Sequence, residues 1–542
     1  MSNLMYLARS GLSAGQSALN IIGNNLVNAT TPGYNRRNIM LGENGGLSTS
    51  VGFYGYGAKV DGVQRSYDAF INTQVRGALS SYSNSTVRYQ SLSGIDNLFA
   101  DVTNNVSTTL SDVFEGLTGL QGKPDDGPGR TNVLAQFRTL ANQFNTRGKA
   151  LDEELKSNTT NIKNTVDDIN NMTSSLAKLN QDIARIQATS GTAPADLLDQ
   201  RDTLLENLSQ QINITVNESP NGVVNVTLQN GTQLVGDDGA SKLSTQQDPG
   251  DPTRLVLMCE DPTGKGQKLN SSIVSGGALA GYLKYRNEDL VDVRNQLNDI
   301  ALQMANAFNE VNQKGFDKNG NAGKPIYGFT PPKVKPNADN TGTSQPTMSY
   351  SDISQVKSQN YNITFKNGAW EVTTEDGSKV NATMNGGKLE FDGVSVDVGS
   401  GAAEGDTFQL NPTEGIASSI TMDLDNADEI ALADNTGGTG NDANLQGFLD
   451  LKNKKLVNGS TISDAYGSLV STIGSRTSEA KNDSERDTGI VSSYAQQKQS
   501  MVGVDLNEEY INMQMYQQYY QANTQMLNTA NTLFDSILRA VG

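Results

Sequence analysis

The sequence predicts an elongated, multidomain α+β protein, and three observations support this expectation. Apolar residues recur every seven positions near both ends of the chain, as they do in helices that pack along one another. Two internal regions instead alternate β-branched with polar residues, which is typical of strands. Only 35% of the 542 residues are hydrophobic, so thin cores in extended domains are expected rather than one compact core.

The first predicted element is a helix that begins near Leu4. Its apolar residues fall into two heptad registers, and the second register contains small residues that would let another helix approach closely. The two registers are Met5, Leu12, Leu19 and Leu26, and Ala8, Gly15, Ile22 and Ala29. The pattern therefore predicts a seam along one side of this helix.

The last predicted element is a C-terminal helix whose seam carries larger side chains. Its register is Leu506, Met513, Tyr520, Leu527, Phe534 and Val541, flanked by Tyr516, Ala530 and Ile537. Isolated helices of this length are marginal in water. The two terminal helices are therefore expected to pair as a coiled coil, or to pack on neighbouring copies. The predicted subunit-packing residues are Leu12, Leu19, Ile22, Leu26, Met513, Tyr520, Leu527 and Phe534.

The N-terminal helix is predicted to end within the stretch NNLVNATTPGYNRR, residues 24–37. Pro32 disfavours helical geometry at Thr31, and Gly33 permits a turn. The chain is thereby redirected into an extended segment that leads outward. We expect Arg36 and Arg37 to be available to carboxylates of neighbouring subunits. The alternative is an ordinary helix end with exposed arginines.

A long helical body is predicted between the two ends. A third seam, which includes Leu155, Ile162 and Ile169, marks a helix over about 147–188. Helical periodicity also covers 82–120, 131–146, 195–211, 283–313 and 464–501. The predicted organisation is a terminal helical domain of 1–68 with 500–542, and a rod-like body of 69–334 with 437–499. A β-rich excursion near 212–282, broken at residues 220–222 and 230–231, belongs to this body.

An inserted β domain that faces outward is predicted over 335–436. Its strands are joined by dipeptides that favour tight hairpins. These dipeptides are Asn367-Gly368, Asp376-Gly377, Gly386-Gly387 and Asp392-Gly393. The glycine-rich stretch 437–440 closes the insert.

Composition excludes several classes of function. The net charge of −18 argues against nucleic acid as a partner. The chain has no histidine, which removes His-dependent catalysis and nearly all zinc chemistry. The single Cys259 allows no internal disulfide and is expected to be a buried strand thiol. No apolar run is long enough to span a membrane, and no cleaved secretory signal is predicted. Taken alone, these features favour the cytosol.

Three motifs could be mistaken for sites, and a structural interpretation is favoured for each. Residues 317–323, DKNGNAG, lack the glycine and glutamate of a calcium loop at their expected positions, so an open polar turn is predicted. Residues 52–57, GFYGYG, are expected to form a β-hairpin rather than a dinucleotide site. Asp199, Arg201 and Asp202 are interpreted as a solvated or interhelical ion-pair face. No catalytic residue, cofactor or metal site is predicted.

The turn at 24–37 carries a pattern that resembles the signature of flagellar rod, hook and hook-associated proteins. The matching residues are Asn24, Asn25, Leu26, Asn28, Thr31, Gly33 and Tyr34. Val27 replaces the usual alanine of this signature, and Gly23 also departs from its commonest form.

Longer stretches are similar, more narrowly, to the hook-associated protein 1 family, whose members form the first hook–filament junction. They are GVQRSYDAFINTQVR (62–76), DLLDQRDTLLENLSQQINITV (196–216) and the C-terminal stretch 507–538. The Asp-Gln-Arg-Asp block and the ending TANTLFDSIL are the most specific parts. The insert at 335–436 supplies little of the resemblance.

The resemblance implies a non-enzymatic subunit that connects the hook to the filament through the second junction protein. It implies self-association in a helical or ring assembly and contact with the hook protein. It also implies a place outside the cell in the flagellum, reached through the flagellar export channel without a cleaved signal peptide. Before export, a chaperone would hold the C-terminal region, with Met513, Tyr516, Tyr520 and Leu527 as the expected contacts.

Two alternatives stay open from the sequence. The chain could be another axial subunit, of the hook or filament type. The insert could instead be an extracellular module with binding or hydrolytic activity, because it contains acid pairs such as Glu371 and Glu375.

Overall fold

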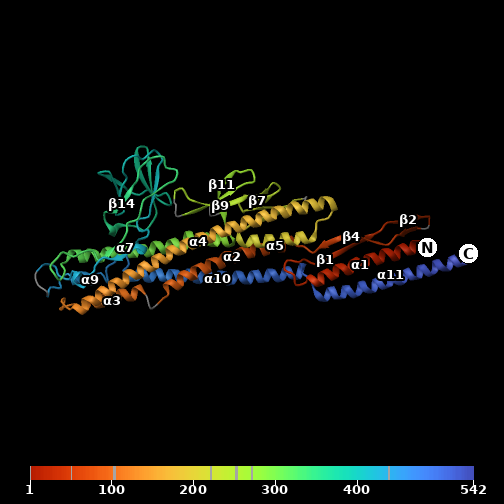
Figure 1. Cartoon of the computed structure of the whole chain (residues 1–542), viewed down its shortest axis with the longest axis horizontal. Coiled ribbons are helices and arrows are strands. Elements are labelled where there is room, and N and C mark those ends of the chain that lie inside the picture. The colour runs from red at the N-terminus through yellow and green to blue at the C-terminus, as the bar shows by residue number, and fades with distance from the viewer. Residues whose placement is uncertain are drawn as a thin grey trace.

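The computed structural model describes residues 2–50, 52–101, 105–219, 222–250, 254–269, 273–436 and 440–541. The turn expected at residues 220–221 and the glycine-rich stretch 437–439 lie outside these residues. The molecule is long and narrow, with helices along its length and two β units on one side (Figure 1). The expectation of an elongated fold that mixes helices and sheets is therefore confirmed.

The two ends of the chain form a pair of antiparallel helices, α1 (Ser2–Asn28) and α11 (Leu506–Val541). They lie side by side, and both termini point to the same end of the molecule (Figure 1). Gly11 of α1 lies against Asn523, and Gly15 lies against Tyr519 and Tyr520. A methyl group on Gly11 would overlap the Asn523 side chain, so this glycine permits the close approach.

The seam of α1 differs from the predicted one in one of its two registers. Ala8, Gly15 and Ile22 are buried, as expected. The second buried register consists of Gly11, Ala18 and Asn25, one residue before Leu12, Leu19 and Leu26. Leu12 and Leu19 are only half-buried, while Met5 and Leu26 are exposed. The prediction was wrong here because it favoured large apolar residues, whereas α11 comes close only over small ones.

The seam of α11 includes polar residues that a hydrophobic pattern does not reveal. Glu509, Asn523 and Ala530 are buried on the heptad register that also contains the half-buried Tyr516. Met513 and Leu527, on the predicted register, are half-buried. Phe534 is 48% exposed, since α11 runs past the start of α1 (Figure 1).

A two-stranded ribbon lies along α1. It pairs β1 (Arg37–Glu43) with β4 (Ala58–Arg65), and it has a β-bulge between Met40 and Leu41. The hairpin of β2 (Gly46–Thr49) and β3 (Gly52–Gly55) forms its tip. The prediction of a β-hairpin around residues 52–57 is therefore confirmed.

The body consists of long helices that run with the molecular axis (Figure 1). The helix expected over 195–211 is confirmed at its bounds, whereas the two expected over 131–146 and 147–188 form one continuous helix. The body helices are α2 (Ala69–Phe99), α3 (Val106–Thr118), α4 (Gly127–Ser190), α5 (Ala195–Gln211), α6 (Gly277–Lys284), α7 (Val291–Lys314), α9 (Leu445–Asp450) and α10 (Ile462–Val502). A π-helix, Tyr285–Leu290, joins α6 to α7. Among the described residues, no helix is long and apolar enough to cross a membrane.

The smaller β unit covers one side of α4. One sheet contains β5 (Thr215–Glu218), β6 (Val224–Thr227), β7 (Gln233–Gly236) and β8 (Gly239–Ala240). The other contains β9 (Lys242–Gln247), β10 (Leu255–Glu260) and β11 (Gly266–Leu269). Cys259 is buried in β10, as predicted. Asn170 and Asn180 of α4 each pair their amide with both backbone groups of a strand residue, Leu243 and Val224 respectively.

The larger β unit stands off the body and contains two four-stranded sheets (Figure 1). Their orders are β13-β20-β15-β16 and β14-β19-β18-β17. The strands are β13 (Lys335–Pro336), β14 (Thr347–Tyr350), β15 (Tyr361–Lys366), β16 (Ala369–Thr374), β17 (Thr383–Asn385), β18 (Lys388–Phe391), β19 (Val394–Asp397) and β20 (Thr407–Leu410). Positive φ angles at Asn367 (53°) and Asp392 (40°) show the tight turns expected at these dipeptides.

After β20 the chain returns to the body. The short helix α8 (Ile416–Ser419) packs on α4 and α7, and β21 (Thr421–Met422) pairs with β12 (Tyr327–Gly328). Buried side chains of the larger β unit and of the body form one continuous cluster. A second cluster lies between the smaller β unit and the helices beneath it.

Candidate functional site

The turn at the base of the terminal helices gathers most of the residues that the sequence singled out. We call residues 24–37, with the start of α11 and the face of α5 that they contact, the joint. The segments that connect the terminal helices to the body pass through or beside the joint (Figure 1). Its side chains are connected by hydrogen bonds and ion pairs.

Asn25 is the central residue of the joint and is 1% exposed. Its amide nitrogen donates to the Arg37 carbonyl at 2.9 Å and to the Glu509 carboxylate at 3.1 Å. Its amide oxygen accepts from the Tyr34 hydroxyl at 2.8 Å and from the Arg37 backbone N–H at 3.0 Å. Burial raises the pKa of Tyr34, which keeps its hydroxyl protonated as a donor. One side chain thus ties together α1, the turn, β1 and α11.

The turn itself is built by Asn28, Thr31 and Gly33. The Thr31 N–H donates to the Asn28 carbonyl at 2.9 Å, and the Thr31 hydroxyl donates to the Asn28 side chain at 3.2 Å. Gly33 has a φ of +78°, and a side chain there would overlap the hydroxyl of Thr203 in α5. Only glycine combines this backbone geometry with so close an approach to α5.

Two residues of the predicted signature face outward instead. Asn24 is exposed, and Leu26 is 38% exposed. Asn24 contributes its backbone carbonyl, which accepts from the Asn28 side chain at 3.0 Å. The other five signature residues, Asn25, Asn28, Thr31, Gly33 and Tyr34, make the contacts within the joint described above.

Arg36 is engaged within the chain, which corrects the expectation that it is available to neighbouring subunits. Its guanidinium donates to both oxygens of Glu508, at 2.9 and 2.8 Å, and to Glu509 at 2.8 Å. Its backbone N–H donates to the carbonyl of Val502, the last residue of α10. Arg36 therefore fastens the turn to the start of α11.

Arg37 and Arg65 connect the base of the ribbon to α5. Arg65 Nη1 lies 2.6 Å from Asp202 Oδ2 and 3.0 Å from Asp199 Oδ1. Arg37 lies 3.8 Å from Asp199, and Asn35 donates to the same carboxylate at 2.7 Å. The structure thus confirms an ion-pair interpretation of the acids in the Asp-Gln-Arg-Asp block, but they are nearly buried rather than solvated.

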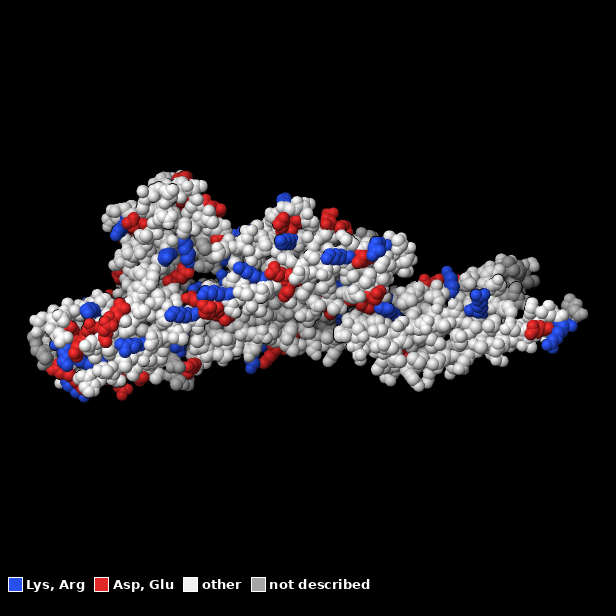
Figure 2. All heavy atoms as spheres, in the orientation of Figure 1, with Lys and Arg blue, Asp and Glu red and all other residues white. Residues whose placement is uncertain are grey.

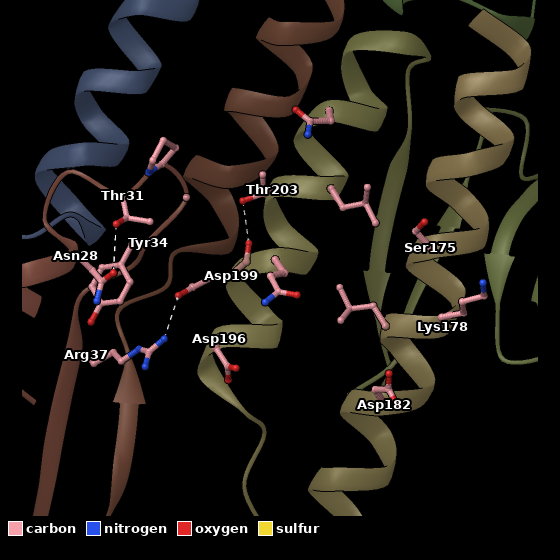
Figure 3. Close-up of a pocket in the computed structure, with 16 residues that line it drawn as sticks. Asn28, Thr31, Tyr34, Arg37, Ser175, Lys178, Asp182, Asp196, Asp199 and Thr203 are labelled. Atoms are coloured by element: carbon pink, nitrogen blue, oxygen red, sulfur yellow. Dashed lines mark hydrogen bonds and ion pairs between the residues drawn. The ribbon is translucent and has the colours of Figure 1, made fainter. Parts of the chain in front are cut away.

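An open pocket of about 740 Å³ lies between the turn, α4 and α5. Figure 3 shows Tyr34, Arg37 and Asp199 on one side of it and Ser175, Lys178 and Asp182 on the facing side. Among its lining residues, Arg37 pairs with Asp199, and Asp182 pairs with Arg185.

The other candidate motifs resolve into structural features. Asp317 accepts hydrogen bonds from the N–H groups of Asn319 and Asn321, as a polar turn requires. Glu371 pairs with Lys379, and Glu375 pairs with Arg254. These glutamates are therefore not a free pair of carboxylates. Within the described residues, no group of three or more His, Cys, Asp and Glu side chains could hold a metal ion.

Comparison with known proteins identifies the family. The chain is 38% identical to a flagellar hook-associated protein 1 of Salmonella typhimurium over 550 residues, which cover 99% of this chain and 100% of that protein. The chain belongs to the flagellar hook-associated protein 1 family.

Other members of the hook-associated protein 1 family are similar over the same length. The Escherichia coli (strain K12) protein is 35% identical over 99% of this chain and 100% of its own length. The Bacillus subtilis (strain 168) protein is 23% identical over 99% of this chain and 97% of its own length.

Family profiles match four separate parts of the chain. Residues 92–327 match the flagellar hook-associated protein FlgK helical domain, and residues 335–412 match the D2-like domain of hook-associated protein 1. Residues 5–35 match the flagella basal body rod protein, and residues 495–540 match the C-terminal part of the flagellar basal body rod FlgEFG proteins. The insert thus carries family similarity that the sequence motifs alone did not reveal.

A solved structure supports the fold assignment. The flagellar hook junction protein FlgK from Burkholderia pseudomallei superposes with a TM-score of 0.71 and is 23% identical in sequence. The match covers 79% of this chain and all of that chain. Members of the hook-associated protein 1 family are structural proteins of the flagellum, where they assemble with hook and junction components.

Proposed function

We propose that this chain is a structural, non-enzymatic subunit of the junction between the flagellar hook and filament. It contacts the hook protein on one side and the second junction protein on the other. The observation that carries the proposal is the terminal helix pair, which exposes apolar side chains although it is fastened firmly to the body. Such surfaces in soluble proteins mark sites of assembly.

The exposed apolar residues lie on both terminal helices. Val27 is 79% exposed, Ile511 64% and Tyr6 63%. Figure 2 shows few charged residues over this part of the molecule, whereas charges are frequent over the body and the β units. Charge-poor helices with exposed apolar groups favour packing against identical neighbours in a helical or ring assembly.

The expected subunit-packing residues fit this role to different degrees. Leu12, Leu19 and Leu26 lie outside the buried seam of α1 and can reach neighbouring copies. Ile22 is 5% exposed and is already used within the chain. In α11, Tyr520 and Phe534 retain exposures of 37% and 48%, while Met513 and Leu527 are half-buried.

We propose the domain division that the sequence predicted. Residues 1–68 with 500–542 form the assembly domain, and residues 69–334 with 437–499 form the body. The β domain of 335–436 faces outward through its two sheets, while its part after Leu410 returns to the body. Supporting observations are the joint between the terminal helices and the body, the strands of the smaller β unit between Thr215 and Leu269, and the two sheets that start at Lys335.

We propose that the chain reaches the outside of the cell through the flagellar export channel without a cleaved signal peptide. An export chaperone would hold Met513, Tyr516, Tyr520 and Leu527 before secretion. Three of these side chains are half-buried, and α1 is the helix that packs on this part of α11. A chaperone bound to this face would therefore exclude α1, so chaperone binding and terminal pairing would be alternatives.

Deletion of the gene tests the proposed function. Cells without the protein should build hooks that carry no filament, and filament subunits should accumulate in the medium. A plasmid copy of the gene should restore filaments. Normal filaments in the deletion strain would refute the junction role.

A further inference from the structure

The charged residues of the Asp-Gln-Arg-Asp block in α5 are nearly buried, although charged side chains usually lie at the surface. We propose that α5 is a positioning helix, and that four of its five charged residues, Asp199, Arg201, Asp202 and Glu206, fix the orientation of the terminal helices on the body. Together they contact three other segments of the chain, at Arg65, Glu218 and Lys498.

The first contact is with the base of the ribbon. Asp199 and Asp202 both bind Arg65, and the three side chains are 10%, 6% and 7% exposed. Salt screens such a buried cluster poorly, and the loss of one partner leaves a charge without compensation. This contact is therefore a firm attachment rather than a surface ion pair.

Arg65 connects the acids of α5 to both strands of the ribbon. It is the last residue of β4 and lies opposite Arg37, the first residue of β1. Both strands of the ribbon are thus held at the point where they meet the turn. Gly33 also lies directly on Thr203 of α5, so the turn cannot shift toward this helix without a collision.

The opposite side of α5 is held by Arg201, which is 2% exposed. Its guanidinium donates to Glu218 at 3.0 Å and to the Gly222 carbonyl at 2.6 Å, both near the edge of the smaller β unit. Neighbouring positions on a helix point in different directions, so Arg201 and Asp202 bind their partners on different sides of α5. Glu206, one turn further along, binds Lys498 of α10.

These contacts together prevent α5 from rotating or sliding. The terminal helices, attached to one side of α5, therefore keep a fixed orientation relative to the body. The fixed orientation is a property of the isolated protein. Only its purpose, to present the assembly surface at a set angle, rests on the proposed function.

Distances between spin labels in the purified full chain test this inference. In a Cys259→Ser background, labels would be placed at Ser174 in α4 and Gln517 in α11, which are both exposed. The unaltered joint should give one narrow distance distribution. In the double variant Asp199→Asn/Asp202→Asn, the distribution should broaden about twofold, because Arg65 loses its charged partners.

Matched variants make the outcome specific. Asp196→Asn should leave the distribution unchanged, since Asp196 is exposed on the same helix and makes no ion pair with a described residue. Arg201→Gln should broaden the distribution as the double variant does. If the double variant does not fold, Arg65→Lys replaces it, because a lysine cannot span both carboxylates as arginine does.

An unchanged distribution in the folded double variant, or in Arg65→Lys, would overturn the inference. An unchanged distance distribution in Arg201→Gln would show that the contact of α5 with the smaller β unit does not help to fix the terminal helices. Neither result would affect the proposed function, which depends on filament growth in cells. Conversely, filaments in the deletion strain would refute the proposed function without altering the distances.

Discussion

Asparagine side chains join separate elements at many points of this molecule. An asparagine side-chain amide offers two donors and two acceptor sites, so it can hydrogen-bond to backbone groups that have no partner in a helix or sheet. Asn25 does so at the joint, Asn170 and Asn180 do so along α4, and Asn309 does so for residues 326 and 327. Helices and sheets with unmatched backbone geometry are thereby connected without a thick apolar core.

Asn25→Ala should destabilise the joint. It leaves the Arg37 backbone, the Tyr34 hydroxyl and Glu509 without their partner, and buried polar groups without a partner cost about 1–3 kcal/mol each. Thermal unfolding and hydrogen exchange at the base of α11 would measure the loss. Asn24→Ala, at an exposed position one residue earlier, should change stability by less than about 0.5 kcal/mol. Equal effects of the two changes would contradict the role given to Asn25.

Gly33→Ala should also weaken the joint. Alanine at a φ of +78° is strained, and its methyl group would overlap Thr203, so a loss of about 1–3 kcal/mol is expected. Thr203→Ala in the same chain should recover part of that loss by removing the overlap. Gly23→Ala is the control, because a methyl group there meets no atom within 4 Å. Chemical denaturation of the four proteins would compare them, and no recovery with Thr203→Ala would exclude the overlap as the cause.

Asp299 should make stability depend on pH. Burial raises the pKa of this carboxyl to about 6, although hydrogen bonds from Gln303 and Asn458 lower it. The unfolded chain has a pKa of about 3.9, so the protonated group favours the folded state below that pH. This contribution disappears as pH rises through about 6. Asp299→Asn should therefore flatten the change in melting temperature between pH 4 and 7, and an unchanged profile would show that Asp299 does not titrate in this range.

At the scale of elements, the sequence predicted most helices and strands but not how they fit. The bounds of α5 and the hairpins of the insert follow from local signals, namely helical periodicity and turn dipeptides. The seam of α1 was misplaced because Gly11 and Asn523 form it, and neither residue contributes to a hydrophobic pattern. The π-helix Tyr285–Leu290 was not predicted. Its wider turn changes the spacing of the apolar residues, and no local sequence signal indicates it.

The joint was predicted only in part for a similar reason. Its signature residues could be picked out as a turn, but their partners Glu509, Asp199 and Arg65 lie far away in the sequence. The sequence around Arg36 does not indicate that its partners, Glu508 and Glu509, belong to the same chain. Contacts between distant segments depend on the assembled fold, and a single sequence does not specify them locally.

Leu527→Asp should prevent assembly through α11. The side chain is half-buried, and full burial of a leucine contributes on the order of 1.5–3 kcal/mol, whereas an unpaired carboxylate there would be unfavourable. Cells with this variant should lack filaments and release filament subunits, while the body of the protein still folds. Asn528→Asp, at the exposed neighbouring position, should be nearly silent. A motility assay that shows equal defects would contradict the packing role of Leu527.

At the scale of the whole molecule, stability should be unevenly distributed. The body and the larger β unit share one cluster of buried apolar side chains, whereas the terminal helices meet mainly through small residues and are exposed elsewhere. Regions with few buried contacts open with a low free energy. The terminal helices are therefore expected to open more readily than the body in the isolated protein.

Hydrogen exchange of the dilute protein would check this distribution. Amides of α4 in the body should be the most protected, and those of α1 and α11 should exchange faster. The slowest amides of α11 should lie between Glu509 and Asn523, which face α1, and protection should fall toward residue 541. Protection should rise along both helices after assembly. Strong protection of both terminal helices in the dilute monomer would contradict this account.

Because α4 is long, a small change of angle at the joint produces a large displacement at its far end. At about 1.5 Å per residue, its 64 residues form a rigid arm of about 95 Å. One end of this arm lies near α5, and the other lies at the far tip of the molecule (Figure 1). A tilt of only about 3° at the joint would displace that tip by about 5 Å, roughly one turn of a helix. Small changes in the geometry of a few charged side chains would therefore shift the position of that distant tip relative to the terminal helices.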